Sequence, residues 1–329
     1  MYDRYKTKRR NTGLYKAAAM LVIAAGLLFA GIRYYRYLAF WKYDQNKLVK
    51  KIEAARHSRN RREALTDLAE TFERYKREHQ TDPEAYYLSG ETHYLLGESY
   101  LPGSFSELFI NDTARNAGKE AKQEFIRAIK DIKKGSALDN GRIDDAYRFV
   151  LARASYYADY NSPGELFGLI EPAGDSVKVR DVDNVRFYSI LAILNRKEER
   201  GMTFLSQHGA VKDSIQGLLF YATAERLAKK YTGAIITYKD VLARTDDDKI
   251  KKLVHVNLGK VYFNQSLYRE SLDQFTLALK IDEKDAMPKI WIGKNYFALG
   301  EKDKAKAIWS EILTTDGTNR EVKDLLKTM

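Results

Sequence analysis

The fold is decided by a segment near the C-terminus that occurs twice in succession. Residues 253–284 read LVHVNLGKVYFNQSLYRESLDQFTLALKIDEK, and residues 287–318 read MPKIWIGKNYFALGEKDKAKAIWSEILTTDGT. An offset of 34 residues pairs Leu258-Gly259 with Ile292-Gly293, Tyr262-Phe263 with Tyr296-Phe297, Ser271 with Ala305, Phe275 with Trp309, and Ala278 with Ile312. Such a period is typical of stacked helical hairpins, because one hairpin cannot cover its own apolar face.

This spacing of small and aromatic residues resembles the tetratricopeptide repeat (TPR). The resemblance implies two antiparallel helices per unit, with Gly259 and Gly293 allowing a neighbouring helix to approach. Ser271 and Ala305 would seat the second helix on the first. We therefore predict an all-α fold: an α-solenoid of TPR-like hairpins preceded by one transmembrane helix.

Basic residues are concentrated at the N-terminus. The net charge is +11, but residues 1–43 alone hold nine Lys or Arg and a single acid, Asp3. The rest of the chain is close to balanced, so the basicity does not indicate a nucleic-acid-binding face. The chain has no cysteine, which excludes disulfides, thiolate catalysis and Cys-ligated zinc.

A membrane anchor is predicted at residues 17–41, after a basic tail at residues 1–16. Residues 17–32 carry no charge, and aromatic residues and arginines follow them. The alternative is a cleaved signal peptide, which Leu28 disfavours because a small residue belongs at that place. Six basic residues lie close to each end of the predicted span, so the distribution of positive charge hardly discriminates between the two orientations in the membrane. We expect a single-pass protein of a bacterial inner membrane, with the repeats in the periplasm.

The remaining chain divides into four predicted parts: a juxtamembrane helical hairpin at 44–82, degenerate TPR-like repeats at 83–210, three TPR units at 214–317, and a capping helix at 318–329. The hairpin has a basic face that would contact anionic headgroups or simply be solvated. Helix starts are expected at Asp82-Pro83, at a Ser162–Glu165 capping box and at a Thr318–Glu321 capping box. Gly90 is expected to be the small residue of the first repeat.

An insertion at residues 99–117 separates the two helices of that first repeat. It carries apolar residues that a solvated loop would not need, among them Leu101, Phe105 and Phe109. Two interpretations remain open. The insertion either folds back onto the stack or is a docking loop for a partner.

No catalytic motif is present. The sequence lacks a phosphate-binding loop, a dinucleotide-binding glycine pattern, a nucleophile elbow and a His-Glu-x-x-His pair, and its five histidines are scattered. Asp246 to Asp248 lack the glycine turn and the distal glutamate of a calcium loop. We predict no enzymatic activity, no cofactor and no metal.

The TPR resemblance implies a protein-binding concave face formed by the first helix of each unit. Carried over unit by unit, it comprises Tyr87, Glu91, Tyr94, Leu219, Thr223, Arg226, Val256, Lys260, Phe263, Asn264, Ile290, Lys294 and Phe297. The partners would be other proteins, membrane-associated ones above all, and a homo-oligomer is possible.

The predicted function is a membrane-anchored scaffold that mediates protein–protein interactions during assembly of a bacterial envelope complex. Alternatives are a component of the periplasmic flagellar-motor collar of a spirochaete, or a cytoplasm-facing targeting receptor. An enzyme with an unrecognised site in residues 99–210 is a further alternative, which a pocket of convergent carboxylates or histidines would favour.

Overall fold

The computed structural model describes residues 20, 24, 26–31, 45–111, 117–173, 182–207 and 214–329. These residues form helices, turns and bends, and no β-strand occurs among them. The all-α prediction is therefore confirmed for the described chain. The chain divides into two compact units, Met1–Gln80 and Thr81–Met329.

In the first unit, the described part contains a helix at residues 45–56 and helix α2 (Arg61–Glu78). Leu48, Ile52 and Ala55 recur at three- and four-residue spacing and are buried. The predicted anchor at residues 17–41 lies mainly outside the described residues. No helix in the described ranges combines the length and the apolar character needed to cross a membrane.

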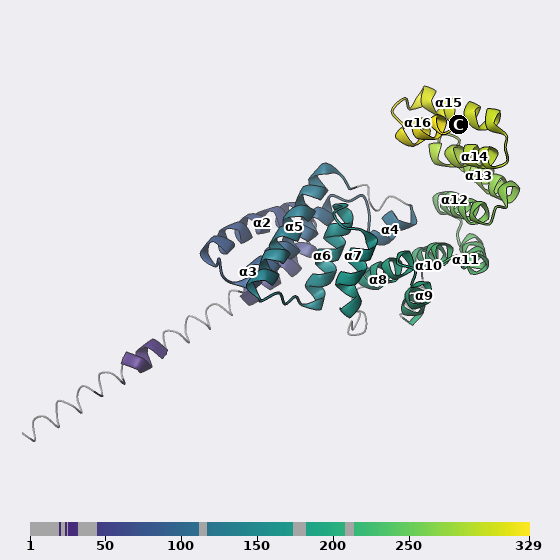
Figure 1. The fold of residues 1–329 in the computed structure, drawn as a ribbon. Helices are drawn as coiled ribbons and strands as arrows, with labels where there is room; N and C mark the ends of the chain where they lie inside the picture. Colours follow the sequence, from purple (N-terminus) through teal and green to yellow (C-terminus); the bar gives the residue numbers. More distant parts are fainter. Residues whose placement is uncertain are drawn as a thin grey trace, which may run out of the picture. The chain divides into compact units, whose positions relative to one another are not determined.

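The second unit is a succession of helices that pack on their neighbours in chain order, except that the short helix at residues 105–110 packs on two later helices (Figure 1). They are α3 (Pro83–Ser99), α4 (Phe105–Ile110), α5 (Lys119–Leu138), α6 (Asp145–Tyr157), α7 (Pro163–Ile170), α8 (Val182–Leu194), α9 (Glu198–Gln207), α10 (Ile215–Leu227), α11 (Tyr231–Arg244), α12 (Asp248–Asn264), α13 (Tyr268–Ile281), α14 (Ala286–Ala298), α15 (Lys302–Thr315) and α16 (Arg320–Lys327), with a 3₁₀ turn, η1 (Glu171–Ala173), after α7. Pairs such as α12 with α13 and α14 with α15 form the hairpins of a TPR-like helical repeat.

Close approach within each hairpin depends on the glycines. A Cβ added at Gly259 would lie 2.7 Å from ring carbons of Phe275, and one added at Gly293 would collide with the Trp309 indole. Ser271 Oγ also donates a hydrogen bond of 2.9 Å to the carbonyl of Gly259. The residues that recur every 34 positions are thus the ones that form the contacts between the two helices of each hairpin.

Gly90 lets α5 approach α3, as predicted, because a Cβ at this position would lie 2.5 Å from Ile132 Cγ1 and 3.2 Å from the Ala128 carbonyl oxygen. Gly97 likewise accommodates the ring of Phe125, at 2.7 Å, as Gly259 does for Phe275. The two glycines thus make room for two different residues of α5, Ile132 and Phe125. Helix α5 has 20 residues, whereas α13 has 14, so α3 packs along a longer partner than α12 does.

Two of the three predicted helix starts are confirmed. Asp82 accepts a hydrogen bond from the Glu84 amide at the start of α3, and Ser162 forms a capping box with Glu165 at the start of α7. The Thr318 capping box is wrong. Asn319 is the N-cap of α16, and its side chain accepts from the Val322 amide.

Candidate functional site

A groove in the second unit lies between the insertion and the first helix of a repeat, α12. Its volume is about 1030 Å³. One wall comes from the insertion and α4, the opposite wall from α12, and one end from the turn before α14. The lining residues are Pro102, Gly103, Glu107, Leu108, Ile110, Asn111, Asp247, Lys249, Ile250, Lys252, Leu253, Val256, Asn257, Lys260, Asp282, Asp285 and Met287.

The groove has an apolar floor and an ion-paired rim. Leu108, Ile110 and Val256 are almost fully buried where they line it. On the rim, Lys252 Nζ lies 2.9 Å from Asp282 Oδ2 and 2.8 Å from Asp285 Oδ2. Its hydrogen bond to Asp285, then that to Asp282, raises the pKa of Lys252, and the bond from Lys252 lowers the pKa of Asp282. Lys252 and Asp282 therefore both keep their charges at neutral pH.

Helix α4 forms its wall because the insertion folds back onto the stack. Ser104 and Glu107 form a capping box that starts the helix. The ring of Phe105 then packs against Phe187 of α8 at 5.3 Å, and the ring of Phe109 packs against Phe220 of α10 at the same separation. Of the two interpretations of the insertion, the structure shows the first.

The docking-loop residues are accordingly corrected. Phe105 is 1% exposed and Phe109 is 8% exposed, so neither ring is available to a partner. Leu101, before the helix, is half-buried. Apolar composition indicated an interface correctly, but the interface is with the chain's own helices.

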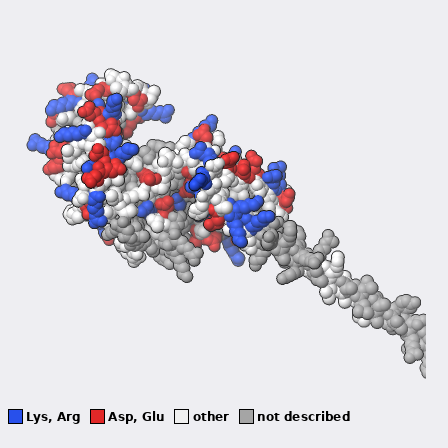
Figure 2. All heavy atoms as spheres, turned by 180° about the vertical axis from the view of Figure 1, so that it is seen from behind, with Lys and Arg blue, Asp and Glu red and all other residues white. Residues whose placement is uncertain are grey.

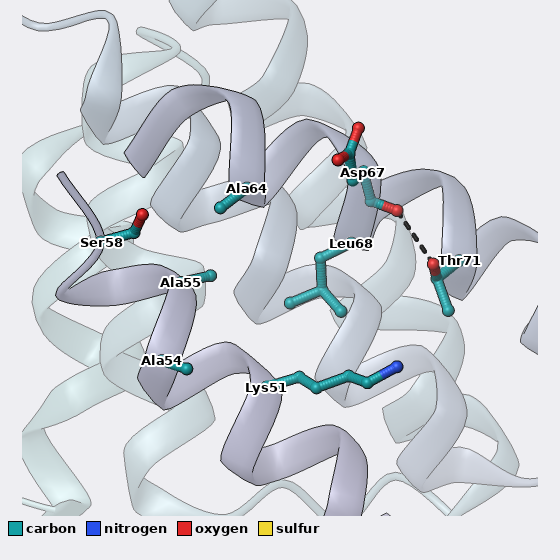
Figure 3. Close-up of a pocket in the computed structure, with 8 residues that line it drawn as sticks. All are labelled: Lys51, Ala54, Ala55, Ser58, Ala64, Asp67, Leu68 and Thr71. Atoms are coloured by element: carbon teal, nitrogen blue, oxygen red, sulfur yellow. Dashed lines mark hydrogen bonds between the residues drawn. The ribbon is translucent and has the colours of Figure 1, made fainter. Parts of the chain in front are cut away.

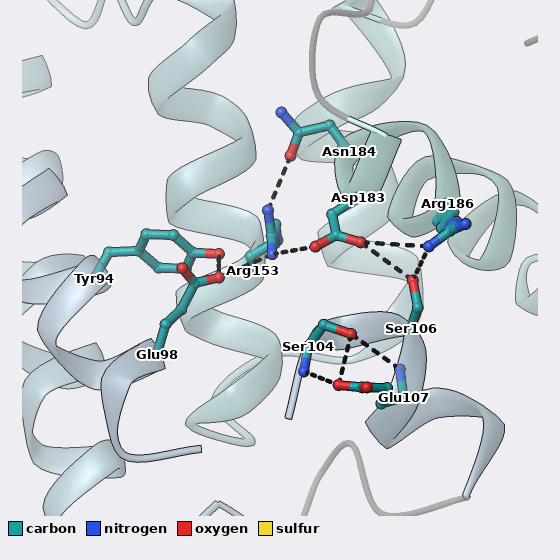
Figure 4. Close-up of polar contacts among 9 residues, drawn as sticks. All are labelled: Tyr94, Glu98, Ser104, Ser106, Glu107, Arg153, Asp183, Asn184 and Arg186. Atoms are coloured by element: carbon teal, nitrogen blue, oxygen red, sulfur yellow. Dashed lines mark hydrogen bonds and ion pairs between the residues drawn. The ribbon is translucent and has the colours of Figure 1, made fainter. Parts of the chain in front are cut away.

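A buried polar network ties α4 to three other helices (Figure 4). Arg186 Nη1 donates to Ser106 Oγ at 2.6 Å, and Ser106 Oγ donates to Asp183 Oδ1 at 3.1 Å. Asp183 Oδ2 lies 3.8 Å from Arg153 Nη2, which also lies 2.9 Å from Glu98 Oε1. Ser106 thus links the insertion to α8, and Arg153 of α6 continues the network to Glu98 of α3.

Tyr94 completes the network on α3. Its hydroxyl donates to Glu98 Oε1, and its ring faces the Arg153 guanidinium at 5.4 Å. Burial raises the pKa of the Tyr94 phenol well above its usual value, so the group remains a donor. Tyr94 therefore packs inside the stack and does not line a concave binding face.

Four other predicted binding residues are corrected for the same reason. The Tyr87 ring stacks on Tyr147 with centroids 4.6 Å apart. Leu219 and Arg226 are buried, and Thr223 is fully buried with its hydroxyl 2.9 Å from that of Tyr238. In these units, neighbouring helices cover the side of the first helix that the resemblance assigned to a partner.

The later repeats bring the predicted residues together. Val256 and Lys260 line the groove, and the Lys260 and Lys294 ammonium groups lie 5.7 and 4.4 Å from the Trp291 ring centroid. Phe263 meets the same ring edge-on at 5.3 Å.

The remaining predicted residues have different surroundings. Ile290 is buried in the last core cluster, Glu91 is half-buried, and Asn264 and Phe297 are exposed.

Sequence reasoning missed most of the polar lining of this groove. Lys252, Asp282 and Asp285 stand at helix ends rather than on the repeated face. The signal that the sequence offered was a charge pattern. Lys252 stands near the start of one repeat, and Asp282 and Asp285 stand just before the start of the next. The contribution of Ile110 had no local signal, because α4 and α12 are far apart in the sequence.

Histidine and serine on α3 have buried carboxylate partners on α5. His93 Nδ1 lies 2.7 Å from Glu124 Oε2, and Ser89 Oγ donates to Asp131 Oδ2 at 2.7 Å. All four residues are at least nine-tenths buried, within the helix pair. These contacts join α3 to α5 and open onto no described pocket.

A smaller hollow of about 360 Å³ lies in the first unit (Figure 3). Lys51 and Ala54 line it from the helix at residues 45–56, Ser58 lines it from the turn that follows, and Ala64 and Asp67 line it from α2. Thr71 Oγ1 donates back to the Asp67 carbonyl at 2.9 Å, so this hydroxyl is used within the helix. The short alanine side chains on both helices leave this space open.

On the face seen in Figure 2, basic and acidic side chains are interspersed over most of the described surface. A continuous stripe of one sign over the repeats is not visible there. This mixed distribution agrees with the near-balanced charge beyond residue 43.

No protein-family model matches the chain. A curated relative, a DnaJ homolog subfamily C member 3 homolog of Dictyostelium discoideum, is 28% identical over 104 residues, which is 32% of this chain and 20% of that protein. The chain thus spans about a fifth of the length of the curated relative that it matches.

Solved structures with similar folds include a tetratricopeptide repeat protein from Parabacteroides merdae (13% identity, TM-score 0.48, 81% of this chain and 97% of that chain). Yeast Tom70 has 12% identity and a TM-score of 0.45, and the match covers 82% of this chain and 53% of that chain. Pseudomonas aeruginosa pilF has 11% identity and a TM-score of 0.38, and the match covers 68% of this chain and 97% of that chain. None of these similarities assigns a partner or an activity to the chain.

Proposed function

We propose that the chain is a non-enzymatic scaffold that binds other polypeptides in the groove between α4 and α12. The observation that carries this proposal is the groove itself. It has a volume of about 1030 Å³ and is bordered by both apolar and ion-paired side chains, which suits the mixed surface of a peptide segment. TPR-like repeats expose such surfaces along a stack of helices.

The carboxylates of the groove support a binding role over a catalytic one. Asp247 caps α12, and Glu107 accepts hydrogen bonds from Ser104 at the start of α4. Asp282 and Asp285 share Lys252. Each acid of the groove is committed to local structure, whereas a general base needs a carboxylate poised toward a substrate.

We further propose that residues 17–41 anchor this scaffold in a bacterial inner membrane, with the repeats in the periplasm, where they serve assembly of an envelope complex. Anchoring would raise the effective concentration of the groove for membrane-bound partners. A spirochaete flagellar-motor collar is one setting for such a protein, and a cytoplasm-facing targeting receptor has the opposite orientation.

The orientation is measured by cysteine labelling, because the chain has no cysteine of its own. A Lys306→Cys variant carries one exposed thiol on α15. Reaction with a membrane-impermeant maleimide is expected once the outer membrane is permeabilised. Labelling only after the inner membrane is lysed would assign the repeats to the cytoplasm.

Binding is tested by photo-crosslinking in cells with the full chain. A photoreactive residue at Asn111 or Ile250, both in the groove lining, is expected to give the same protein adducts from either wall. The matched control is Lys239, an exposed residue of α11 outside the groove. Adducts that are equally strong at Lys239, or absent from both groove positions, would overturn the proposal.

A further inference from the structure

Positive charge is concentrated in one segment of the first unit. Residues 45–62 contain seven basic residues and one acid, Glu53; the basic residues are Lys47, Lys50, Lys51, Arg56, Arg59, Arg61 and Arg62. The following residues, 63–80, contain five acids and three basic residues. The hairpin therefore has its positive charge on the first helix and the turn rather than along its whole length.

Three lysines form one flank of the helix at residues 45–56. Leu48, Ile52 and Ala55 make its buried side. At about 100° per residue, Lys47, Lys50 and Lys51 fall within an arc of roughly 100° beside that buried stripe. All three lysines are exposed. We call Lys47, Lys50 and Lys51 the lysine flank.

The lysine flank keeps a net positive charge among the described residues of its own helix, which carry three flank lysines against one acid. The one acid of this helix, Glu53, lies about 60° from Lys50 at i, i+3 spacing, so it offsets one of the three positive charges at the edge of the flank. Asp67 of α2 faces the hollow that Lys51 lines (Figure 3), so the hollow itself is a poor phosphate site. The flank is better suited to a broad anionic surface than to a single bound anion.

The chain places this flank close to the apolar segment. Lys47 follows Ile32 by fifteen residues, so even a fully extended chain keeps it within roughly 50 Å of the end of residues 17–32. Clusters of Lys and Arg beside a membrane segment are attracted to anionic headgroups within a Debye length of the surface. No feature of the described chain places the lysine flank near a nucleic acid in the way that its distance from residues 17–32 places it near a membrane.

We propose that the lysine flank lies on the anionic headgroups of the bilayer that holds residues 17–41. The inference rests on the proposed anchoring. The contact would fix the hairpin at the membrane surface instead of leaving it on a free tether.

The test is lysine acylation followed by mass spectrometry, on full-length chain reconstituted into vesicles. One set is pure phosphatidylcholine and the other contains phosphatidylglycerol. Lys47, Lys50 and Lys51 are expected to react roughly fivefold more slowly in the anionic vesicles. Lys239 and Lys306, exposed residues of the second unit, are internal controls and should react equally in both. High salt should abolish the difference.

Charge dependence is tested at Lys51. Its protection is expected to persist in Lys47→Arg/Lys50→Arg and to disappear in Lys47→Gln/Lys50→Gln. Equal labelling of the flank in both vesicles, with the chain resistant to carbonate extraction, would overturn this inference alone. A chain that washes off both vesicles would overturn the anchor as well. If an oligonucleotide or free phosphate protected the flank lysines from acylation and anionic vesicles did not, the proposed contact between the lysine flank and lipid headgroups would be wrong.

Discussion

At the scale of single residues, Gly259 determines how closely α12 and α13 pack. A methyl group at this position would lie 2.7 Å from the Phe275 ring, which is fully buried and cannot move aside freely. Gly259→Ala should destabilise the fold, because overpacking costs about 1–3 kcal/mol and exceeds the roughly 1 kcal/mol that alanine gains in helix propensity. Urea unfolding followed by circular dichroism measures the difference.

Gly168→Ala is the matched control for this substitution. Gly168 lies in α7, and a Cβ there would meet nothing within 4 Å. Alanine should therefore be neutral or stabilising by up to about 1 kcal/mol. A Gly259→Ala protein as stable as this control would contradict the role given to Gly259.

Glu171 is expected to make a pH-dependent contribution to the stability of the folded chain. Its Oε1 atom lies 2.6 Å from Lys197 Nζ and 2.7 Å from Arg200 Nη1. The hydrogen bond from Lys197, followed by the charges of both cations, lowers its pKa from the ordinary 4.5. A lowered folded-state pKa means that the stabilisation is complete above the unfolded value and is lost as pH falls through the folded one.

Glu171→Gln should therefore lower stability at neutral pH by less than about 1 kcal/mol, since the pair is partly exposed. The gap between the two proteins should narrow as pH falls below the ordinary pKa of the carboxyl group. Glu283→Gln, at an exposed acid in the turn before α14, is the control. A gap independent of pH would show that the ion pairs contribute nothing.

At the scale of elements, local rules predicted helix ends well where a single side chain decides. Asp82 and Ser162 cap α3 and α7 as their sequences indicate. Thr318 failed because Asn319, also a good cap, stands next to it, and the preceding turn lets Asp316 accept from Thr318 instead. When two adjacent residues can both cap a helix, the conformation of the preceding turn decides which one does. Local sequence rules do not predict that conformation.

The insertion marks the limit of local reasoning. Its apolar residues required a cover, but the choice between the stack and a partner depended on Phe187 and Phe220, about 80 and 110 residues away. Ser106 reaches Asp183 and Arg186 over a similar separation. Such contacts leave no periodic trace in a single sequence.

Phe105→Ala tests whether these contacts hold the insertion. Phe105 is 1% exposed and touches rings from three other elements, so truncation should cost about 3–5 kcal/mol. Limited proteolysis should then cut faster within residues 99–117. Tyr160→Ala, at an aromatic residue 59% exposed, should stay within about 1 kcal/mol of the parent protein. Unchanged cleavage would mean that other contacts position α4.

At the scale of the whole second unit, the repeat period predicted which helices pair but not which faces remain open. In α12 and α14 the carried-over residues Val256, Lys260 and Lys294 lie at or near the groove. In α3 the same rule chose Tyr87 and Tyr94, which α5 and α6 cover. A lengthened hairpin changes what packs on its first helix, so the resemblance loses accuracy where the period is broken.

The last helix is predicted to act as a cap for the stack. Val322 of α16 is fully buried with Trp309, Ile312 and Ile290, and this cluster ends the core of the last repeat. In a stack whose repeats contact only their neighbours, losing the cap should weaken α14 and α15 first. Val322→Asp places a charge in this cluster while leaving the helix surface unchanged. Hydrogen exchange should therefore accelerate in residues 286–315 and change little in residues 215–244, whereas Lys323→Ala, at an exposed neighbour, should alter neither. Equal acceleration in both regions would show that the second unit unfolds as one cooperative body, and the nearest-neighbour description of the stack would then be wrong.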